Sequence, residues 1–277
     1  MEAPLMAKTH KSKSTLKDRV RRMFKNNELC TLAFDALEED IEVQTLLEDS
    51  NRMAIDRLGY SDHGHIHSLI VTMNGMRLFR ILTDVVSPTI VQEETGTIED
   101  AQLIVLLGCY LHDVGMSVHR EGHHEFSVSI ALPILNRILA KVYPKDLHKQ
   151  VHVRGHVLHA IQAHDKVISP STIEAGIVGI ADALDMTKGR ARIPFEAGSV
   201  NIHSASAMAI ERVTIHRGKD RTVRIEVSMS NASGIFQIQE LLEKKIESAE
   251  QLTGHIELYA VMTGSEDRIL SEQLRIL

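Results

Sequence analysis

Residues 100–115 read DAQLIVLLGCYLHDVG, an apolar run that ends in an imidazole and a carboxylate. Because nearly every position of the run is apolar, it predicts a helix that is buried on most of its faces. His112 and Asp113 at its end are then buried as well, and burying a charge without a partner costs free energy. A divalent cation bound by both side chains supplies that partner, so the run predicts a metal-binding helical protein.

Two further segments place metal-binding side chains on apolar helices. His63 and His67 lie four residues apart in SDHGHIHSLIV, residues 61–71, and positions i and i+4 share one face of a helix. Asp182 lies within GIVGIADALDM, residues 176–186, which is again almost wholly apolar. Three apolar helices that each present a His or Asp inward are typical of metal sites inside helical bundles.

Histidine is concentrated in the same part of the chain. Twelve of the 16 histidines lie between His63 and His164, and histidine is the commonest metal ligand. His159 and His164 are about 140° apart on an ideal helix, so both can bind one centre only if the helix ends or bends between them. The histidines that we interpret as ordinary surface residues are His65, His119, His148, His152 and His156.

Composition excludes several classes of protein. Hydrophobic residues make up 43% and charged residues 25%, which is the balance of a globular protein and not of a disordered chain. Aromatic residues make up 4% and the net charge is −6, so a stacking surface for single-stranded nucleic acid is not favoured. The chain shows no apolar run of about 18 residues, no secretory leader and no cysteine framework. We therefore expect a cytoplasmic protein without a membrane partner.

Charge and periodicity divide the chain into three segments. Residues 1–26 carry eight Lys or Arg against two Asp or Glu and are interpreted as a basic arm. Residues 27–194 have helical periodicity and form the predicted helical domain. Residues 195–277 include alternating stretches, such as TVRIEVSM at 222–229, which predict a small α+β domain. The predicted fold is mainly α, with a helical bundle followed by a small α+β unit of ferredoxin-like type.

The order of these motifs resembles the HD superfamily of metal-dependent phosphohydrolases. SDHGHIHSLIV, CYLHDVGMSVHREGHHEFS, HAIQAH and GIADALD follow one another over residues 55–193, about half of the chain. The resemblance implies an HD-type bundle in which His67 is the first ligand, His112 and Asp113 are the name-giving pair, and Asp182 is the last ligand. It also implies further ligands for a second metal. The first of these is His123, which precedes the small residue Ser127, or alternatively His124. His164 and His159 are the next two, and His63 is an additional ligand or a supporting residue.

The implied activity is hydrolysis of a nucleotide or another small phosphate ester. Met116 replaces the lysine of the cyclic-dinucleotide phosphodiesterases in this superfamily, and no Gly-Tyr-Pro motif is present, so that subclass is not favoured. Mixed imidazole and carboxylate donors suit one or two ions of Fe, Mn, Co or Zn. Such ions lower the pKa of a bound water. Asp113 is expected to bridge two ions, and Asp182 to orient the attacking water.

Candidate phosphate-binding cations follow the last metal motif. Lys188, Arg190 and Arg192 lie in TKGRARIP directly after Asp182, and Arg120 lies between the earlier motifs. Guanidinium groups match phosphate oxygens in pairs. The alternative interpretation is that these residues cap a helix and solvate a linker.

Two other functions remain open from the sequence. The site could bind a nucleotide as a regulatory sensor without fast turnover, or it could belong to an HD-type nuclease that uses the basic arm. The α+β unit carries no motif, and we expect it to form a homo-oligomer.

Overall fold

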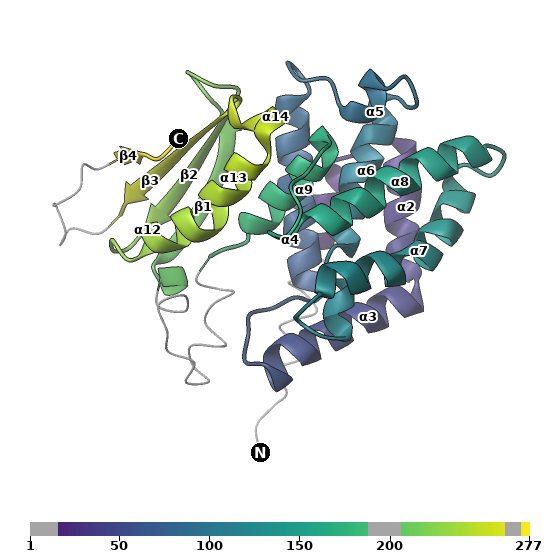
Figure 1. Ribbon diagram of the computed structural model, residues 1–277, viewed down its shortest axis with the longest axis horizontal. Coiled ribbons are helices and arrows are strands. Elements are labelled where there is room, and N and C mark those ends of the chain that lie inside the picture. Colours follow the sequence, from purple (N-terminus) through teal and green to yellow (C-terminus); the bar gives the residue numbers. More distant parts are fainter. Residues whose placement is uncertain (1–15, 188–205, 264–272) are drawn as a thin grey trace.

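The computed structural model describes residues 16–187, 206–263 and 273–277. A body of helices lies beside a small sheet with its own helical layer (Figure 1). The body contains α2 (Glu28–Glu39), α3 (Ile41–Asn51), the π-helical turn η1 (Arg52–Arg57), α4 (His65–Leu82), α5 (Thr89–Gln92), α6 (Ile98–Leu111), the 3-10 turn η2 (Val114–Ser117), α7 (His123–Val142), α8 (Leu147–Ala163) and α9 (Ile173–Ala183). None of the described helices is both long and apolar enough to cross a membrane.

Helix α6 forms the centre of the bundle, as the sequence predicts. It begins with a capping box between Thr97 and Asp100, and every residue from Leu103 to Leu111 is buried. Helices α2, α4, α8 and α9 all contact it. A Cβ atom on Gly108 would lie 2.9 Å from Val178 and 3.3 Å from Ala160, so glycine allows α9 and α8 to approach closely. The bundle therefore converges on the end of α6, where His112 and Asp113 follow.

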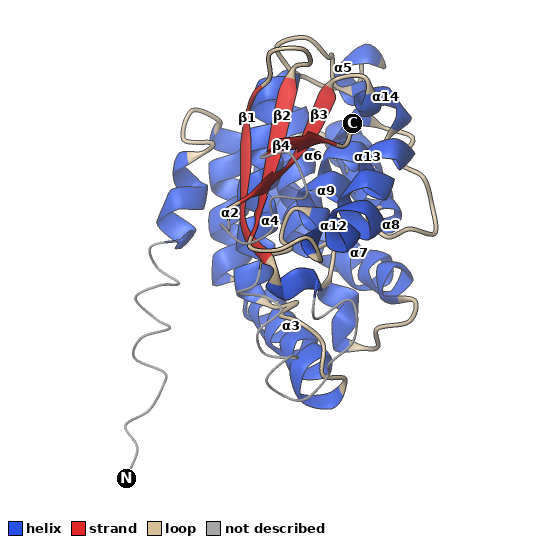
Figure 2. Cartoon of the chain, turned by 90° about the vertical axis from the view of Figure 1, so that its left-hand side faces the viewer, coloured by secondary structure: helices blue, strands red, loops and turns tan. Residues whose placement is uncertain are grey.

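The C-terminal unit is a four-stranded sheet with one helical crossover. Its elements are β1 (Ile210–Arg217), β2 (Val223–Met229), α12 (Gly234–Gln237), the π-helical turn η3 (Ile238–Glu243), α13 (Lys244–Ser248), α14 (Glu250–Thr253), β3 (Ile256–Met262) and β4 (Gln273–Arg275). The strand order is β1-β2-β3-β4 (Figure 2), in which β2 and β3 are parallel and the outer pairs are antiparallel. The small α+β unit is thus confirmed. The prediction of a ferredoxin-like topology is wrong. A tight turn joins β1 directly to β2, so the described residues contain one helical crossover, whereas the ferredoxin-like β-α-β-β-α-β pattern has two.

The crossover helices of the C-terminal unit pack on the bundle. Helix α9 contacts η3, α13 and α14, and helix α4 contacts β1 and β2. At Gly176 of α9, a Cβ atom would lie 3.0 Å from Leu252 and 3.2 Å from Ala249. The α+β unit is therefore packed against the two helices that carry His67 and Asp182.

Residues 16–26, the described part of the predicted basic arm, pack against the bundle. Residues 16–22 are helical, Val20 is fully buried, and Phe24 is 2% exposed against the Phe34 ring at a centroid distance of 5.3 Å. Lys17 and Arg21 pair with Glu38 and Asp35 of α2. The charged residues of this segment face outward, whereas its apolar residues complete the core of the bundle.

We expect Phe24→Ala to lower the free energy of unfolding by about 3–5 kcal/mol, the usual cost of removing a buried aromatic ring. A chain that starts at Asn27 is expected to lose more, because it also lacks Val20. Urea unfolding monitored by circular dichroism measures the change, with Lys25→Ala as the exposed control. An unchanged midpoint in Phe24→Ala would show that this segment is not part of the core.

Candidate metal centre

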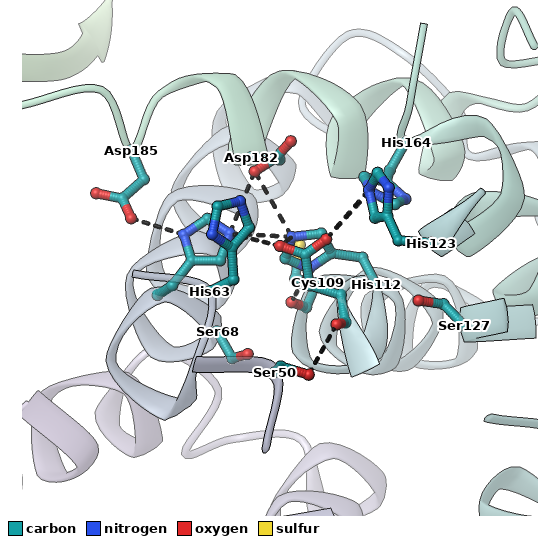
Figure 3. A network of polar contacts seen from close by, with 12 residues as sticks. Ser50, His63, Ser68, Cys109, His112, His123, Ser127, His164, Asp182 and Asp185 are labelled. Atoms are coloured by element: carbon teal, nitrogen blue, oxygen red, sulfur yellow. Dashed lines mark hydrogen bonds and ion pairs between the residues drawn. The ribbon is translucent and has the colours of Figure 1, made fainter. Parts of the chain in front are cut away.

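Four residues of the predicted site meet at one end of the bundle, among them His112 and Asp182, which are labelled in Figure 3. The Nε2 atoms of His67 and His112 are 3.1 Å apart. Asp113 Oδ2 lies 3.3 Å from each of them. Asp182 Oδ1 lies 3.3 Å from His67 and 3.6 Å from His112. Helices α4 and α9 and the end of α6 thus direct four donor atoms to one point.

A second group of donors adjoins the first. The Nε2 atoms of His123 and His164 are 3.1 Å apart. Asp113 Oδ1 lies 3.4 Å from His123 and 3.5 Å from His164. Asp113 therefore presents one carboxylate oxygen to each pair of histidines. Gly115 permits this arrangement, because its N–H donates to Ser127 Oγ and a Cβ would lie 2.1 Å from the carbonyl of His123.

The protonation of these four histidines is set by their other ring nitrogen. In each ring Nδ1 faces an oxygen that can only accept a hydrogen bond, so Nδ1 carries the proton and donates. The acceptors are Asp185 Oδ2 at 2.7 Å for His67, the carbonyl of Cys109 at 2.9 Å for His112, the carbonyl of Arg120 at 2.8 Å for His123, and the carbonyl of Ile161 at 2.6 Å for His164. Each neutral ring then directs the lone pair of Nε2 at its neighbour.

Lone pairs that face each other repel unless a cation or a proton lies between them. The distances between the donor atoms can therefore be compared with the distances expected around one metal ion. Two donors that are each about 2.1 Å from one ion, at angles between 90° and the tetrahedral value, lie about 3.0–3.4 Å apart. Most of the nitrogen and oxygen separations, 3.1–3.4 Å, lie within this range, and the two longest, 3.5 and 3.6 Å, exceed it slightly. Histidines that bind metals also donate their other N–H to a carboxylate or a carbonyl, as these do. The residues therefore fit a divalent metal at both groups.

The electrostatics of the centre favour a positive charge. Burial alone would lower the pKa of His112, but the carboxylates of Asp113 and Asp182 raise it to about 9. Burial alone would raise the pKa of Asp113, but the surrounding imidazoles, His112 first, hold it well below its usual range. The pKa of Asp182 is also held well below its usual range by His112 and His67, against the effect of burial. In the metal-free protein a proton on His112 thus takes the place of the cation.

The structure places His63 and His124 beside the two groups. His63 Nδ1 lies 2.6 Å from the carbonyl of Ser61, and its ring centroid is 5.6 Å from that of His67. His124 Nδ1 lies 3.5 Å from Asp165 Oδ2, which is also 3.7 Å from His123 Nδ1. Neither ring contributes to the four converging Nε2 atoms. The structure thus places His123 among the converging rings and places His63 and His124 beside them.

His159 is not brought to the centre. Its Nε2 lies 2.9 Å from Ser171 Oγ and accepts from the backbone N–H of Ser171. The reason is the helical angle between His159 and His164: α8 continues to Ala163 without a bend, so only His164 at its end points inward. The expectation that both are ligands is therefore corrected. Lys188, Arg190 and Arg192 lie outside the described residues.

A cavity of about 210 Å³ opens beside the centre. Asp113, His123, His164 and Asp182 form one wall, and Arg120 lies at the edge with its guanidinium 5.1 Å from the centroid of the Tyr60 ring. Asp182, with 23% of its side chain exposed, is the most open of the acidic donors. Asp182 is thus the carboxylate of the centre that is most accessible from the cavity.

Four charged lining residues were not predicted from the sequence. They are Asp165, Lys166, Asp185 and Lys245. Asp185 follows Asp182 by three residues in GIADALD, so helical spacing alone could have identified it. Lys245 belongs to α13 of the C-terminal unit, and no local pattern connects it with the histidines.

The fold and the site define a helical protein with a buried His/Asp centre that fits divalent metals. A family model described as HD domain matches residues 64–187, and the chain belongs to this family. HD-domain proteins are mostly metal-dependent phosphohydrolases. The predicted family and fold are thereby confirmed.

Two relatives have been found among known proteins. The uncharacterized protein MJ1020 of Methanocaldococcus jannaschii is 44% identical over 230 residues, which cover 83% of this chain and 88% of the relative. Ribonuclease Y of Thermoanaerobacter pseudethanolicus is 26% identical over 160 residues, which cover 54% of this chain and 28% of that enzyme. No solved structure matches the chain.

Proposed function

We propose that the protein is a metal-dependent phosphohydrolase that cleaves a nucleotide or another small phosphate ester. The observation that carries this proposal is the position of Asp113, whose two oxygens face two separate pairs of histidine lone pairs. This donor set suits two ions of Fe, Mn, Co or Zn better than Ca or Mg. When bound, such ions supply a hydroxide nucleophile at neutral pH and polarise phosphoryl oxygens.

The protein's own residues contribute positioning and charge. Asp113 connects the two groups of ligands, because one of its oxygens faces each pair of histidines. Asp185 fixes the orientation of the His67 ring by accepting a hydrogen bond from Nδ1. Asp182 borders the cavity, where its carboxylate can accept a hydrogen bond from the attacking water. Arg120 at the edge offers a guanidinium to phosphate oxygens.

The size and charge of the cavity support a small anionic substrate. Pockets for drug-sized ligands have volumes of about 300–1,000 Å³. A cavity of about 210 Å³ therefore admits the phosphate end of a substrate and leaves the remainder at the opening. The described lining residues include four carboxylates and three cations, a net charge of −1 when the histidines are neutral. Two divalent ions change this to +3, so the metal-loaded site attracts an anion.

The direct test is phosphate release by protein reconstituted with Mn²⁺, Fe²⁺, Co²⁺ or Zn²⁺ in turn. We expect turnover of at least one nucleoside monophosphate or other small ester, and loss of that turnover after chelation. Metal-loaded protein that releases no phosphate from any ester in the panel contradicts the proposal.

RNA hydrolysis is a second candidate, and the similarity to ribonuclease Y favours it. Incubating the same metal-loaded protein with a labelled single-stranded RNA separates the two activities. Cleavage of RNA without turnover of small esters supports the nuclease. Tight binding of a nucleotide with no turnover of either substrate supports a sensor.

Arg120→Ala is expected to raise KM for the cleaved ester by about 10–150-fold, the effect of losing one charge-assisted hydrogen bond. Metal content is expected to stay at the wild-type level, because Arg120 contributes no donor to the centre. Steady-state kinetics and elemental analysis measure both, with Arg52→Ala as the control, since Arg52 pairs with Asp49 on the surface. An unchanged KM would assign phosphate binding to other cations, among them Lys188, Arg190 and Arg192.

A further inference from the structure

Lys245 is the one cation of the C-terminal unit that lines the cavity among the described residues. It lies on α13, which packs against α9, the helix of Asp182. Its Nζ donates a hydrogen bond to the carbonyl of His164. A lysine from a separate structural unit thus reaches the backbone of a candidate metal ligand.

The ammonium group of Lys245 has unused hydrogen-bonding capacity. An ammonium offers three donors, and the carbonyl of His164 is its one hydrogen-bond partner among the described residues. No described carboxylate forms an ion pair with it. By contrast, the preceding residue, Lys244, is exposed and pairs with Glu240 Oε2 at 2.6 Å. Lys245 is therefore held at the cavity without a carboxylate at ion-pair distance among the described residues, while Asp182, Asp165 and Asp113 attract its charge from farther away.

We propose that Lys245 binds the phosphate group of the substrate, so that the C-terminal unit completes the site of the bundle. This inference rests on the proposed function for its substrate class, a phosphate ester, and concerns the same cavity. Lysine binds phosphate as a point charge and can donate to more than one oxygen. The other cations that line the cavity in the described residues, Arg120 and Lys166, belong to the bundle, and Lys245 supplies a cation from the C-terminal unit.

A purely structural role for Lys245 makes a different prediction. Its bond to the carbonyl of His164 caps α8, and lysine commonly binds the last carbonyls of a helix. If capping were its whole role, substitution would disturb His164 and hence metal binding. Phosphate binding per metal-loaded molecule would then stay unchanged.

The experiment titrates inorganic phosphate into full-length, metal-loaded protein by calorimetry, with metal content measured on the same samples. Lys245→Met removes the charge and keeps most of the stem. Lys245→Gln removes the charge and retains an N–H donor for the carbonyl of His164. Lys244→Met is the matched control. We expect both Lys245 variants to weaken phosphate binding by about 10–150-fold at wild-type metal content, and the control to bind as wild type does.

Several outcomes overturn the inference: wild-type protein that does not bind inorganic phosphate, Lys245→Gln that binds it as wild type does, or affinity losses that follow metal loss. The proposed function fails separately. Phosphate binding that depends on Lys245, in a protein that hydrolyses no ester, leaves the inference standing and rejects the phosphohydrolase. Ester turnover with an unchanged KM in Lys245→Gln leaves the phosphohydrolase standing and rejects the inference about Lys245.

Discussion

Asp113→Ala is expected to lose metal from both groups of ligands and to lower metal affinity by more than 100-fold. Asp113 Oδ2 faces His67 and His112, and Oδ1 faces His123 and His164, so one substitution removes a donor from each group. Loss of a residue that only supports a ligand typically costs 10–100-fold in metal affinity, and loss of a shared donor costs more. Ester hydrolysis is expected to fall below detection with the metal.

Elemental analysis after reconstitution with Mn²⁺ and dialysis measures this effect. The matched control is His159→Ala, which removes a histidine of the same helix that carries His164 but contacts Ser171 instead. We expect the control to keep its metal and Asp113→Ala to keep none. Equal metal content in the two variants would show that the buried cluster is not the metal centre.

Most of the bundle could be predicted from the sequence because its signals are local. The apolar run before His112 predicts a buried helix, and helix α6 covers it. Helices α2 to α9 all lie within residues 27–194, the predicted helical domain. The alternation in TVRIEVSM corresponds to β2. Helical and strand periods extend over many residues, so small errors at the ends do not hide them.

The remaining features depend on packing between distant segments. The pairing of His123 with His164 requires α7 and α8 to lie side by side, and no spacing in the sequence states which histidine of α8 turns inward. Lys245 reaches the cavity only because α13 packs on α9. The basic residues near the N-terminus favoured the interpretation of residues 1–26 as an arm. Val20 and Phe24 of this segment nevertheless belong to the core, and they lie four residues apart on one helical face.

The stability of the metal-free protein is expected to fall as pH rises from about 6.5 to about 9. The pKa of His112 is about 9 in the folded chain, against an ordinary value of 6.5. The folded, metal-free protein therefore holds a proton that the unfolded chain releases in this range, and stability decreases wherever the native state binds more protons. The contribution is fully present below about pH 6.5 and is lost as pH passes about 9. At 1.36 kcal/mol per pKa unit, the loss amounts to about 3 kcal/mol.

Bound metal removes this pH dependence, because a cation then occupies the position that the proton takes on His112. A metal that binds at His112 must displace that proton below about pH 9, so its affinity is expected to rise about 100-fold between pH 7 and pH 9. Urea unfolding at several pH values, with chelator and with Mn²⁺, measures the stability, and His112→Gln is the variant that isolates the group. Asp113 and Asp182, whose pKa values are depressed, titrate only in acid and do not contribute in this range. If metal-free wild type and His112→Gln show the same pH dependence above pH 6.5, the proton does not reside on His112, and another group must carry it in the metal-free protein.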